Sequence, residues 1–226
     1  MDQRDLWVSG EGDYHTYRIP ALVLTGSGRI LAFCEGRRES RSDTGQIDLL
    51  LRTSEDDGLT WTDGIVVVTE AGMTCGNPCP VVDHKAGRVV LTFCRNIGDI
   101  GDTPITEGKG PRAVWSTYSD DDGGTWSPPA DVTDEAKDPA WTWYATGPGH
   151  GIQLPSGRLI VPCDHMVGDY FDRKADPYHS HVILSDDGGT SWRIGGIVDE
   201  GTNECAIALL EDGQVYINCR NYRGWN

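Results

Sequence analysis

The sequence is poor in positive charge and has no long hydrophobic run. It carries 19 Lys and Arg residues against 35 Asp and Glu, which gives a formal net charge of −16. This charge repels the phosphates of nucleic acids overall, so no nucleic-acid partner is expected. No apolar run reaches the length that crosses a bilayer, so no membrane span is expected either. A small anionic ligand is still compatible with this charge, because a local arginine cluster can dominate the field of one pocket.

Signals for secretion are also missing. The first residues lack the apolar stretch of a signal peptide. The seven cysteines are an odd number, which without a secretory segment favours a reducing compartment. The cytoplasm is therefore the expected location, with secretion left open if a leader precedes this start. Because neither low-complexity tracts nor linkers occur, residues 1–226 are expected to form a single domain.

One eight-residue motif occurs three times. It follows the pattern S-x-D-x-G-x-[TS]-W, and its serines are 65 and 66 residues apart. The copies are Ser54–Trp61, Ser119–Trp126 and Ser185–Trp192. Five matching positions at a nearly constant period indicate a duplicated supersecondary unit.

The motif has the chemistry of a tight β-hairpin turn. Its Ser and Asp side chains can bond nearby backbone amides, its Gly supplies a positive φ, and its Trp can cover the turn. Apolar runs flank the copies at Asp48–Arg52, Ile65–Val68, Arg112–Tyr118, His181–Leu184 and Ile194–Val198. The acidic residues resemble a calcium loop, but the ligand spacing and terminal Glu of such a loop are missing, which favours a structural turn.

A second repeat consists of a Gly turn, an apolar strand and a cysteine. Its copies are Gly28–Cys34, Gly87–Cys94, Gly157–Cys163 and Gly213–Cys219, and the apolar partner strands before them are Pro20–Leu24, Pro78–Val82, Gly151–Leu154 and Ala206–Leu210. Hairpins at this spacing predict an all-β repeat fold, and units of about four strands predict a β-propeller. The expected blades are residues 1–68, 69–132, 133–198 and a partial 199–226, or about three to four blades.

The residues at the ends of these strands suggest both a core and a pocket. The four cysteines occupy equivalent positions in different blades, so buried thiols are expected rather than disulfide partners. Polar residues follow them, namely Glu35–Arg38, Arg95–Asn96, Asp164–His165 and Arg220–Asn221. Inner strands of a propeller end around one axis, so these side chains are expected to meet there. The alternative is that they are solvated strand ends, as charged residues usually are.

The segment Tyr17–Pro20, with the three repeated boxes, resembles the non-viral, Asp-box group of sialidases (neuraminidases). The resemblance continues in order through Ala32–Arg37, Asp43–Asp48, Asn77–Pro80, Gly147–His150, Asn203–Cys205 and Asn218–Arg220. It implies a six-bladed β-propeller and an exo-α-sialidase that hydrolyses terminal sialic acid with retention of configuration. Sialylated glycans are the implied partners, and neither a cofactor nor a metal is expected.

The resemblance assigns three arginines to the substrate. Sialic acid carries a carboxylate on its anomeric carbon, and guanidinium groups form paired, charge-assisted hydrogen bonds with carboxylates. Arg18 and Arg220 match two of the family's three carboxylate-binding arginines, and Arg37 matches a further pocket arginine. The alternative for Arg18 and Arg220 is an ordinary charge at a strand end.

Two acidic residues match catalytic positions of the family. Asp43 matches the aspartate that gives a proton to the departing oxygen. Glu204 matches the glutamate that accepts the proton of a tyrosine nucleophile, which approaches the substrate carboxylate without a charge of its own. The alternatives are a loop Asp in a turn for Asp43 and a strand-edge Glu for Glu204.

Further residues are expected around the sugar. Asp164 and His165 follow the third inner strand, where they can face the glycerol tail or the N-acyl group. Residues expected at the rim are Arg95, Asn96, Asp99 and Asp102. Trp141, Trp143 and Tyr144 are interpreted either as stacking surfaces for sugar or, more commonly for aromatic residues, as core.

The resemblance places the tyrosine nucleophile and the third arginine well after Asn218–Arg220. This chain stops at Asn226, six residues beyond Arg220, and Tyr222 is not expected to replace the nucleophile. The expectation is therefore an incomplete propeller with little or no activity alone, whose partner is a missing carboxyl-terminal half. Two other functions stay open: a noncatalytic propeller that binds sialic acid, and an interaction propeller in which the boxes serve only as turns.

Overall fold

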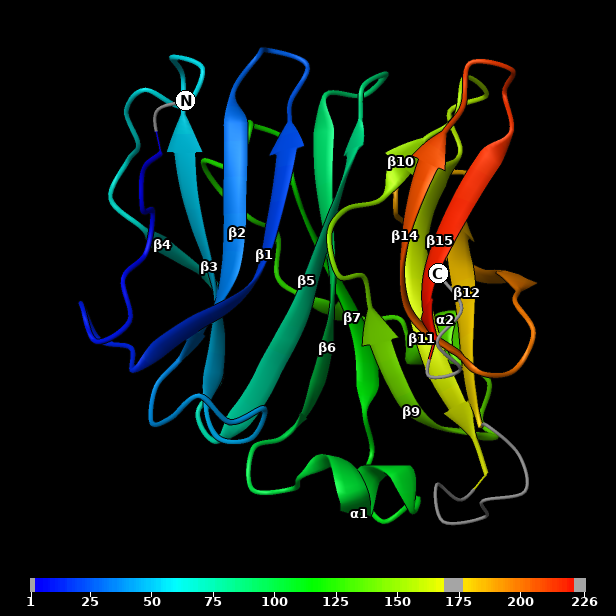
Figure 1. The fold of residues 1–226 in the computed structure, drawn as a ribbon. Coiled ribbons are helices and arrows are strands. Elements are labelled where there is room, and N and C mark those ends of the chain that lie inside the picture. The colour runs from blue at the N-terminus through cyan, green and yellow to red at the C-terminus, as the bar shows by residue number, and fades with distance from the viewer. Residues whose placement is uncertain (1–2, 169–176, 222–226) are drawn as a thin grey trace.

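The computed structural model describes residues 3–168 and 177–221, and most of its elements are antiparallel hairpins (Figure 1). The first two groups of strands are β1 (Thr16–Leu24), β2 (Ile30–Arg37), β3 (Ile47–Ser54), β4 (Ile65–Val68), β5 (Met73–Asp83), β6 (Arg88–Ile97), β7 (Ala113–Ser119) and β8 (Ala130–Asp131). The rest are β9 (Trp141–Thr146), β10 (Ile152–Gln153), β11 (Leu159–Val167), β12 (Tyr178–Ser185), β13 (Arg193–Ile197), β14 (Thr202–Leu209) and β15 (Val215–Asn221). Two short helices, α1 (Asp102–Thr106) and α2 (Thr133–Ala136), lie between strands. The expected all-β class is confirmed.

The strands form successive hairpin sheets. In the first sheet the hydrogen-bonded order is β1-β2-β3-β5-β6-β7-β8, with β4 paired to β3. Only one parallel pair, Ile47 with Thr74, joins β3 to β5, so this sheet is two four-stranded units joined at one end. The next sheet has the order β10-β11-β12-β13, with β9 also paired to β11, and β14 pairs with β15 in the last. Each predicted Gly-to-Cys strand lies within one of the strands β2, β6, β11 and β15.

The three boxes are tight turns with one hydrogen-bond pattern. In the second box the Ser119 hydroxyl donates to Asp121 at 2.8 Å and accepts from the Gly123 amide at 2.8 Å. Asp121 also accepts from the amide and the hydroxyl of Thr125, at 2.8 and 2.7 Å. These donors favour the charged carboxylate and lower the pKa of Asp121 to about 2. The Asp121 carboxylate thus accepts hydrogen bonds from its own turn, as the structural interpretation expects.

The second box also helps to join one hairpin unit to the preceding one. Gly123 has φ near +85°, and a Cβ at this position would lie 3.0 Å from Leu31 and 3.1 Å from Leu51. The neighbouring Trp126 packs edge-on against Phe33, with ring centroids 5.8 Å apart. A glycine is required here both for the left-handed backbone and for the close approach to the preceding unit.

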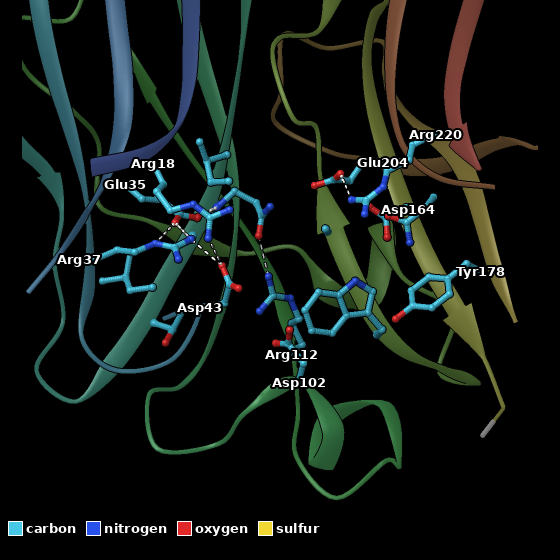
Figure 2. A pocket seen from close by; sticks show the side chains of 18 residues that line it. Arg18, Glu35, Arg37, Asp43, Asp102, Arg112, Asp164, Tyr178, Glu204 and Arg220 are labelled. Carbon is cyan, nitrogen blue, oxygen red and sulfur yellow. Dashed lines mark hydrogen bonds and ion pairs between the residues drawn. The ribbon is translucent and has the colours of Figure 1, made fainter. Parts of the chain in front are cut away.

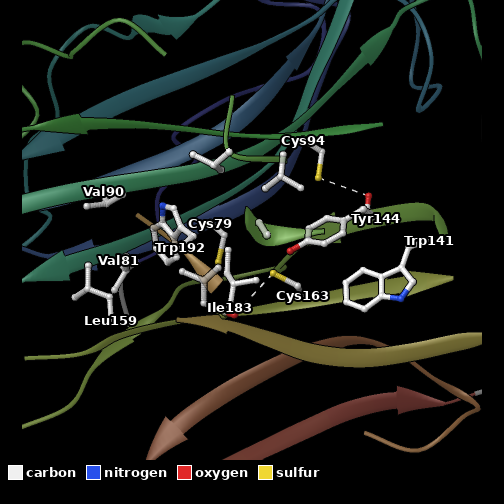
Figure 3. Packing of buried hydrophobic residues seen from close by; sticks show 14 residues of the cluster. Cys79, Val81, Val90, Cys94, Trp141, Tyr144, Leu159, Cys163, Ile183 and Trp192 are labelled. Atoms are coloured by element: carbon white, nitrogen blue, oxygen red, sulfur yellow. Dashed lines mark hydrogen bonds between the residues drawn. The ribbon is translucent and has the colours of Figure 1, made fainter. Parts of the chain in front are cut away.

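The buried core lies between neighbouring sheets. Figure 3 shows the larger cluster, in which strands β5, β6, β9, β11 and β12 meet around Tyr144 and Trp192. The other large cluster joins β2 and β3 to β5 and β6 through side chains such as Phe33 and Phe93. Six of the seven cysteines are buried, and Cys219 is half-buried. Over residues 3–168 and 177–221, no helix has the length and apolar character that a membrane crossing requires.

Strand β9 was not expected from the sequence. It pairs with β11 opposite β12, and it places Trp141 and Tyr144 in the core rather than on a binding surface. Its residues belong to neither repeat, so the periodicity carried no signal for it.

Candidate active site

Polar side chains from several sheets line one pocket, with a volume of about 260 Å³, at the end of the molecule where α1 lies (Figures 1 and 2). This volume suits a single small ligand rather than a polymer. Three parts can be distinguished. One wall comes from β1, β2 and the loop after β2, the opposite wall comes from β11, β12, β14 and β15, and the floor comes from β5, β9 and the segment before β7.

Register shifts in three strands help to orient the side chains that line the pocket. The antiparallel register shifts between Arg18 and Ala21 in β1, between Gly76 and Cys79 in β5, and across 202–205 in β14. At the first two shifts the backbone takes a positive φ, 54° at Ile19 and 56° at Asn77. β-Bulges are common beside functional sites because the extra residue redirects neighbouring side chains. The pocket therefore lies where three equivalent strands leave regular pairing.

On the first wall, two arginines share one carboxylate. Asp43 lies 3.0 Å from a guanidinium nitrogen of Arg18 and 2.7 Å from one of Arg37. Arg37 is buried and also donates to Glu35 at 2.6 and 2.9 Å and to the carbonyl of Arg41 at 2.8 Å. Arg37 is thus fixed from several directions, whereas Arg18 and Asp43 keep exposed faces toward the opening.

The opposite wall carries a second ion pair. Arg220, near the end of β15, lies 2.7 Å from a carboxylate oxygen of Glu204, near the start of β14. The antiparallel pairing of these two strands brings the residues together although 16 positions separate them in sequence. About half of the Arg220 side chain is exposed, so its guanidinium is accessible to a ligand.

The floor contains a buried arginine. Arg112 donates to the carbonyl of Tyr144 at 2.5 Å and to the side-chain oxygens of Asn96 and Asn77, each at 2.7 Å. Its guanidinium lies over the Trp143 ring, 4.2 Å from the ring centroid. Among the residues that the structure describes, no carboxylate lies within ion-pair distance of Arg112. The direct hydrogen-bond partners of Arg112 are therefore neutral, and the floor is cationic.

Asp164 is a buried carboxyl group in this pocket. Its residue is 1% exposed, and neither side-chain oxygen has a hydrogen-bond partner within the described part of the chain. Burial, followed by the negative charge of Glu204, raises the pKa of Asp164 to about 8, although Arg112, the nearby Trp143 indole and Arg220 act in the opposite direction. Asp102, at the rim on α1, also has a raised pKa because the surrounding pocket partly desolvates it.

His165 does not reach the pocket. Successive residues of a strand point to opposite faces, so His165 turns into the core where Asp164 turns into the pocket. Its imidazole stacks on Trp141 with centroids 3.5 Å apart, and its Nδ1 lies 3.0 Å from Nδ1 of His181. Burial lowers the pKa of His165 to about 3. In the described residues, no three His, Cys, Asp or Glu side chains are grouped so as to hold a metal ion.

Most of the expected site residues meet in this pocket. Those that line it are Arg18, Arg37, Asp43, Asp102, Trp143, Asp164, Glu204 and Arg220. Arg95 does not: it pairs with Glu70 and lies over Trp115. Tyr222 lies outside the described residues. The sequence analysis placed Glu35 among the polar residues expected at the axis and Asn203 in a family motif, without a role for either. It gave no site role to Tyr178 and treated Arg112 only as the start of a strand.

Comparisons with known proteins agree with this geometry. The family model described as a BNR repeat-like domain matches residues 28–226. The exo-alpha-sialidase of Aspergillus fumigatus is 36% identical over 228 residues, covering 92% of this chain and 52% of the relative. The structure of the Hadza microbial sialidase Hz136 superposes with a TM-score of 0.85 at 28% identity, covering 96% of this chain and 44% of that one.

A more distant structure shows the same fold. Trypanosoma rangeli sialidase in complex with sialic acid gives a TM-score of 0.74 at 20% identity, covering 92% of this chain and 34% of that one. The chain spans about half the length of the curated relatives that it matches. The expected sialidase-type propeller is therefore confirmed over the length that this chain covers.

Proposed function

Because the chain belongs to the sialidase family with BNR repeats, we propose that its pocket is the sialic-acid site of a retaining exo-α-sialidase. The observation that carries this proposal is the meeting of Arg18, Arg37 and Arg220 in one pocket with Asp43 and Glu204 on opposite walls. The substrate class is terminal sialic acid on glycoconjugates.

The arginines suit the substrate carboxylate. Arg18 and Arg220 are half-exposed and approach from opposite walls, so that a carboxylate between them can accept charge-assisted hydrogen bonds from both. Arg37 is already oriented by its buried partner Glu35, and therefore little side-chain entropy is lost when the ligand binds. Both existing ion pairs are accessible, which lets a ligand anion compete for the guanidinium groups.

Asp43 is proposed as the proton donor to the departing oxygen. Asp43 lies on the loop after β2, 3.0 Å from Arg18 and 2.7 Å from Arg37, and it is exposed toward the pocket opening. A substrate carboxylate bound by these arginines lies next to Asp43, so the Asp43 carboxyl group can reach the departing oxygen.

Glu204 is proposed to assist a tyrosine nucleophile by accepting the phenol proton during attack on the anomeric carbon. Its ion pair with Arg220 orients the carboxylate at the wall opposite Asp43. This geometry supports attack and departure on opposite faces of the sugar. The roles proposed for this chain are therefore to bind the substrate carboxylate, to donate a proton through Asp43 and to accept one through Glu204. No described tyrosine is assigned the attack.

The test compares two ligands that differ only in charge. Methyl α-sialoside and its methyl ester are titrated into the protein by calorimetry, with wild type, Arg18→Ala and Arg220→Ala. We expect the ester and each variant to lose about tenfold or more in affinity, because each removes a hydrogen bond between charged groups. Arg88→Ala is the matched control, because Arg88 forms its ion pair with Asp120 outside the pocket.

Release of sialic acid from a fluorogenic sialoside tests for the enzyme. Release that Asp43→Asn abolishes while binding persists supports a sialidase. Binding without release is expected both of a noncatalytic sialic-acid-binding propeller and of residues 1–226 alone, for which no described tyrosine is assigned the attack. Absence of binding by the wild-type protein contradicts the proposal and leaves an interaction propeller.

A further inference from the structure

Asp164 has no structural task that explains its burial. It lies near the end of β11, is 1% exposed, and lines the pocket while both of its carboxyl oxygens lack a hydrogen-bond partner in the described residues. Buried polar groups in proteins are nearly always hydrogen-bonded, since an unpaired one loses its hydration without replacement. Among the described residues, the one polar contact of the carboxyl group is with the Trp143 indole, which also lines the pocket. Most of its hydrogen-bonding capacity is therefore unmet by the described residues, and the group lies beside the ligand space (Figure 2).

The other fully buried aspartate near this end of the molecule shows the contrast. Asp48 lies 2.6 Å from Arg38 and accepts hydrogen bonds from Tyr14 at 2.9 Å and Thr69 at 2.8 Å. Every one of these partners belongs to the protein, so Asp48 is a structural residue whose hydrogen bonds are made within the fold. Asp164 has none of these bonds, although it is equally buried.

Burial and the neighbouring charges together set the protonation state of Asp164. The titratable groups that face it are Glu204 and Cys205 on β14, Arg220 on β15, Arg112 before β7, Cys94 on β6 and Tyr144 on β9. Strand β12 pairs Ser180 opposite it and contributes Tyr178 to the pocket wall. Burial and Glu204 outweigh the two arginines, so the pKa of Asp164 rises to about 8 and the group is uncharged at neutral pH.

An uncharged carboxyl group has different recognition chemistry from a carboxylate. It offers one O–H donor and one carbonyl acceptor side by side, whereas the ionised group can only accept. A hydroxyl or an amide of a ligand can satisfy both of its atoms. An ionised Asp164 would instead add a negative charge to a pocket that is proposed to hold an anionic sugar.

We propose that Asp164 is a specificity-determining residue that binds an uncharged hydroxyl or amide group of the sugar through its neutral carboxylic acid form. This inference rests on the proposed sialic-acid site and adds the protonation state that the site requires. It follows that the pocket loses affinity when Asp164 ionises, because the donor disappears and the new charge repels the ligand carboxylate.

The experiment measures methyl α-sialoside affinity by calorimetry from pH 6 to pH 9.5 for wild type and Asp164→Asn. The asparagine keeps a donor and an acceptor but does not titrate. With a pKa of about 8, we expect wild-type affinity to fall about tenfold between pH 7 and pH 9. The Asp164→Asn protein should bind with nearly the same affinity across this range, and Asp164→Leu should bind weakly at every pH.

A second group titrates in the same range and must be separated. Burial lowers the pKa of Lys137 to about 8, and its ammonium group donates to the backbone carbonyl of Arg112 at 2.8 Å. If Lys137 caused the alkaline loss, Asp164→Asn would keep that loss. Asp120→Asn, which lies outside the pocket, is the control and should retain the wild-type loss. Circular dichroism at each pH verifies that all proteins are folded.

The outcomes distinguish this inference from the proposed function. Wild-type binding that is independent of pH, or that falls in parallel in Asp164→Asn, overturns the role of Asp164 and leaves the sialic-acid site intact. A wild-type protein that fails to bind at every pH contradicts both. Two analogues, one with a shortened glycerol tail and one with an altered N-acyl group, identify the sugar group that Asp164 contacts. The analogue without that group should bind with the same affinity at pH 7 and pH 9, and the other should still bind more weakly at pH 9.

Discussion

Arg37 and Glu35 form a buried ion pair, with a guanidinium nitrogen 2.6 Å from a carboxylate oxygen and both side chains only 3% exposed. The second oxygen of Glu35 accepts the backbone N–H of Asn77 at 2.8 Å, which ties β2 to the bulge in β5. Arg37 in turn reaches Asp43. The buried pair therefore connects the second hairpin unit to the proposed proton donor at the pocket surface.

Replacing Glu35 should destabilise the protein strongly. Glu35→Ala leaves the Arg37 guanidinium buried with a single exposed carboxylate and two carbonyls as partners. Removing one member of a buried pair typically costs about 3–5 kcal/mol. Urea denaturation should show a loss of this size in the free energy of unfolding. Asp43→Ala is the comparison, because exposed ion pairs contribute about 0–1 kcal/mol, and equal losses in both variants would contradict the buried role of Glu35.

A methyl group at position 76 should disturb the hydrogen bond between Glu35 and the Asn77 amide. A Cβ on Gly76 would lie 2.7 Å from an oxygen of Glu35, so Gly76→Ala must push that carboxylate away from the Asn77 amide. We expect a stability loss of about 1–3 kcal/mol, as for overpacked sites, together with weaker binding of methyl α-sialoside. Thermal unfolding and calorimetry measure the two effects.

The matched control is Gly26→Ala. Nothing lies within 4 Å of a Cβ at this position, and its φ is not in the left-handed region. Stability and affinity close to those of the wild type are expected there. A wild-type affinity in Gly76→Ala would show that the Glu35 position does not matter to the pocket.

The sequence predicted the hairpins well because their signals are local. Glycine turns, apolar runs and the Asp boxes each specify a few neighbouring residues, and the structure places strands at β2, β6, β11 and β15 where the second repeat predicted them. The motif match also selected Arg18, Arg37 and Arg220, which line one pocket.

Two parts of the site depended on information that is not local. Arg112 is held by acceptors from β5, β6 and β9, so nothing in its own segment shows that it forms the floor. His165 was grouped with Asp164 because both are polar and adjacent. Strand alternation sends them to opposite faces, and a neutral imidazole is accommodated in the core by Trp141 and His181.

The boxes should make stability depend on acid pH. In the folded protein, hydrogen bonds from Thr60 and Thr125 lower the pKa values of Asp56 and Asp121 to about 2. Their ordinary value is about 3.9, so the unfolded chain binds these protons first as pH falls. The stabilisation is complete above pH 4 to 5 and is lost as pH approaches 2.

Denaturation between pH 2 and pH 5 tests this dependence. The free energy of unfolding of the wild type should decrease as pH falls, and Asp121→Asn should show a shallower decrease because one titrating group is gone. The double variant Asp56→Asn/Asp121→Asn should be shallower still, since the boxes lie in separate turns and their effects should add. If the free energy of unfolding fell equally steeply with pH in the wild type and both variants, Asp56 and Asp121 would not be the groups that cause the dependence.

The charges on either side of Asp164 should shift its titration in opposite directions. Glu204 disfavours the ionised form of Asp164 and Arg112 favours it. Glu204→Gln should therefore lower the pKa of Asp164 below about 8, and Arg112→Gln should raise it. Carbon-13 NMR of the Asp164 carboxyl group in the ligand-free protein measures each pKa without requiring any binding, and Asp164→Asn assigns the resonance.

The control is Arg88→Gln, which removes a cation outside the pocket and should leave the titration midpoint of Asp164 unchanged. If Glu204→Gln and Arg112→Gln moved the midpoint in the same direction, changes in the burial of Asp164 would outweigh the neighbouring charges, and the opposing effects assigned to Glu204 and Arg112 would be wrong.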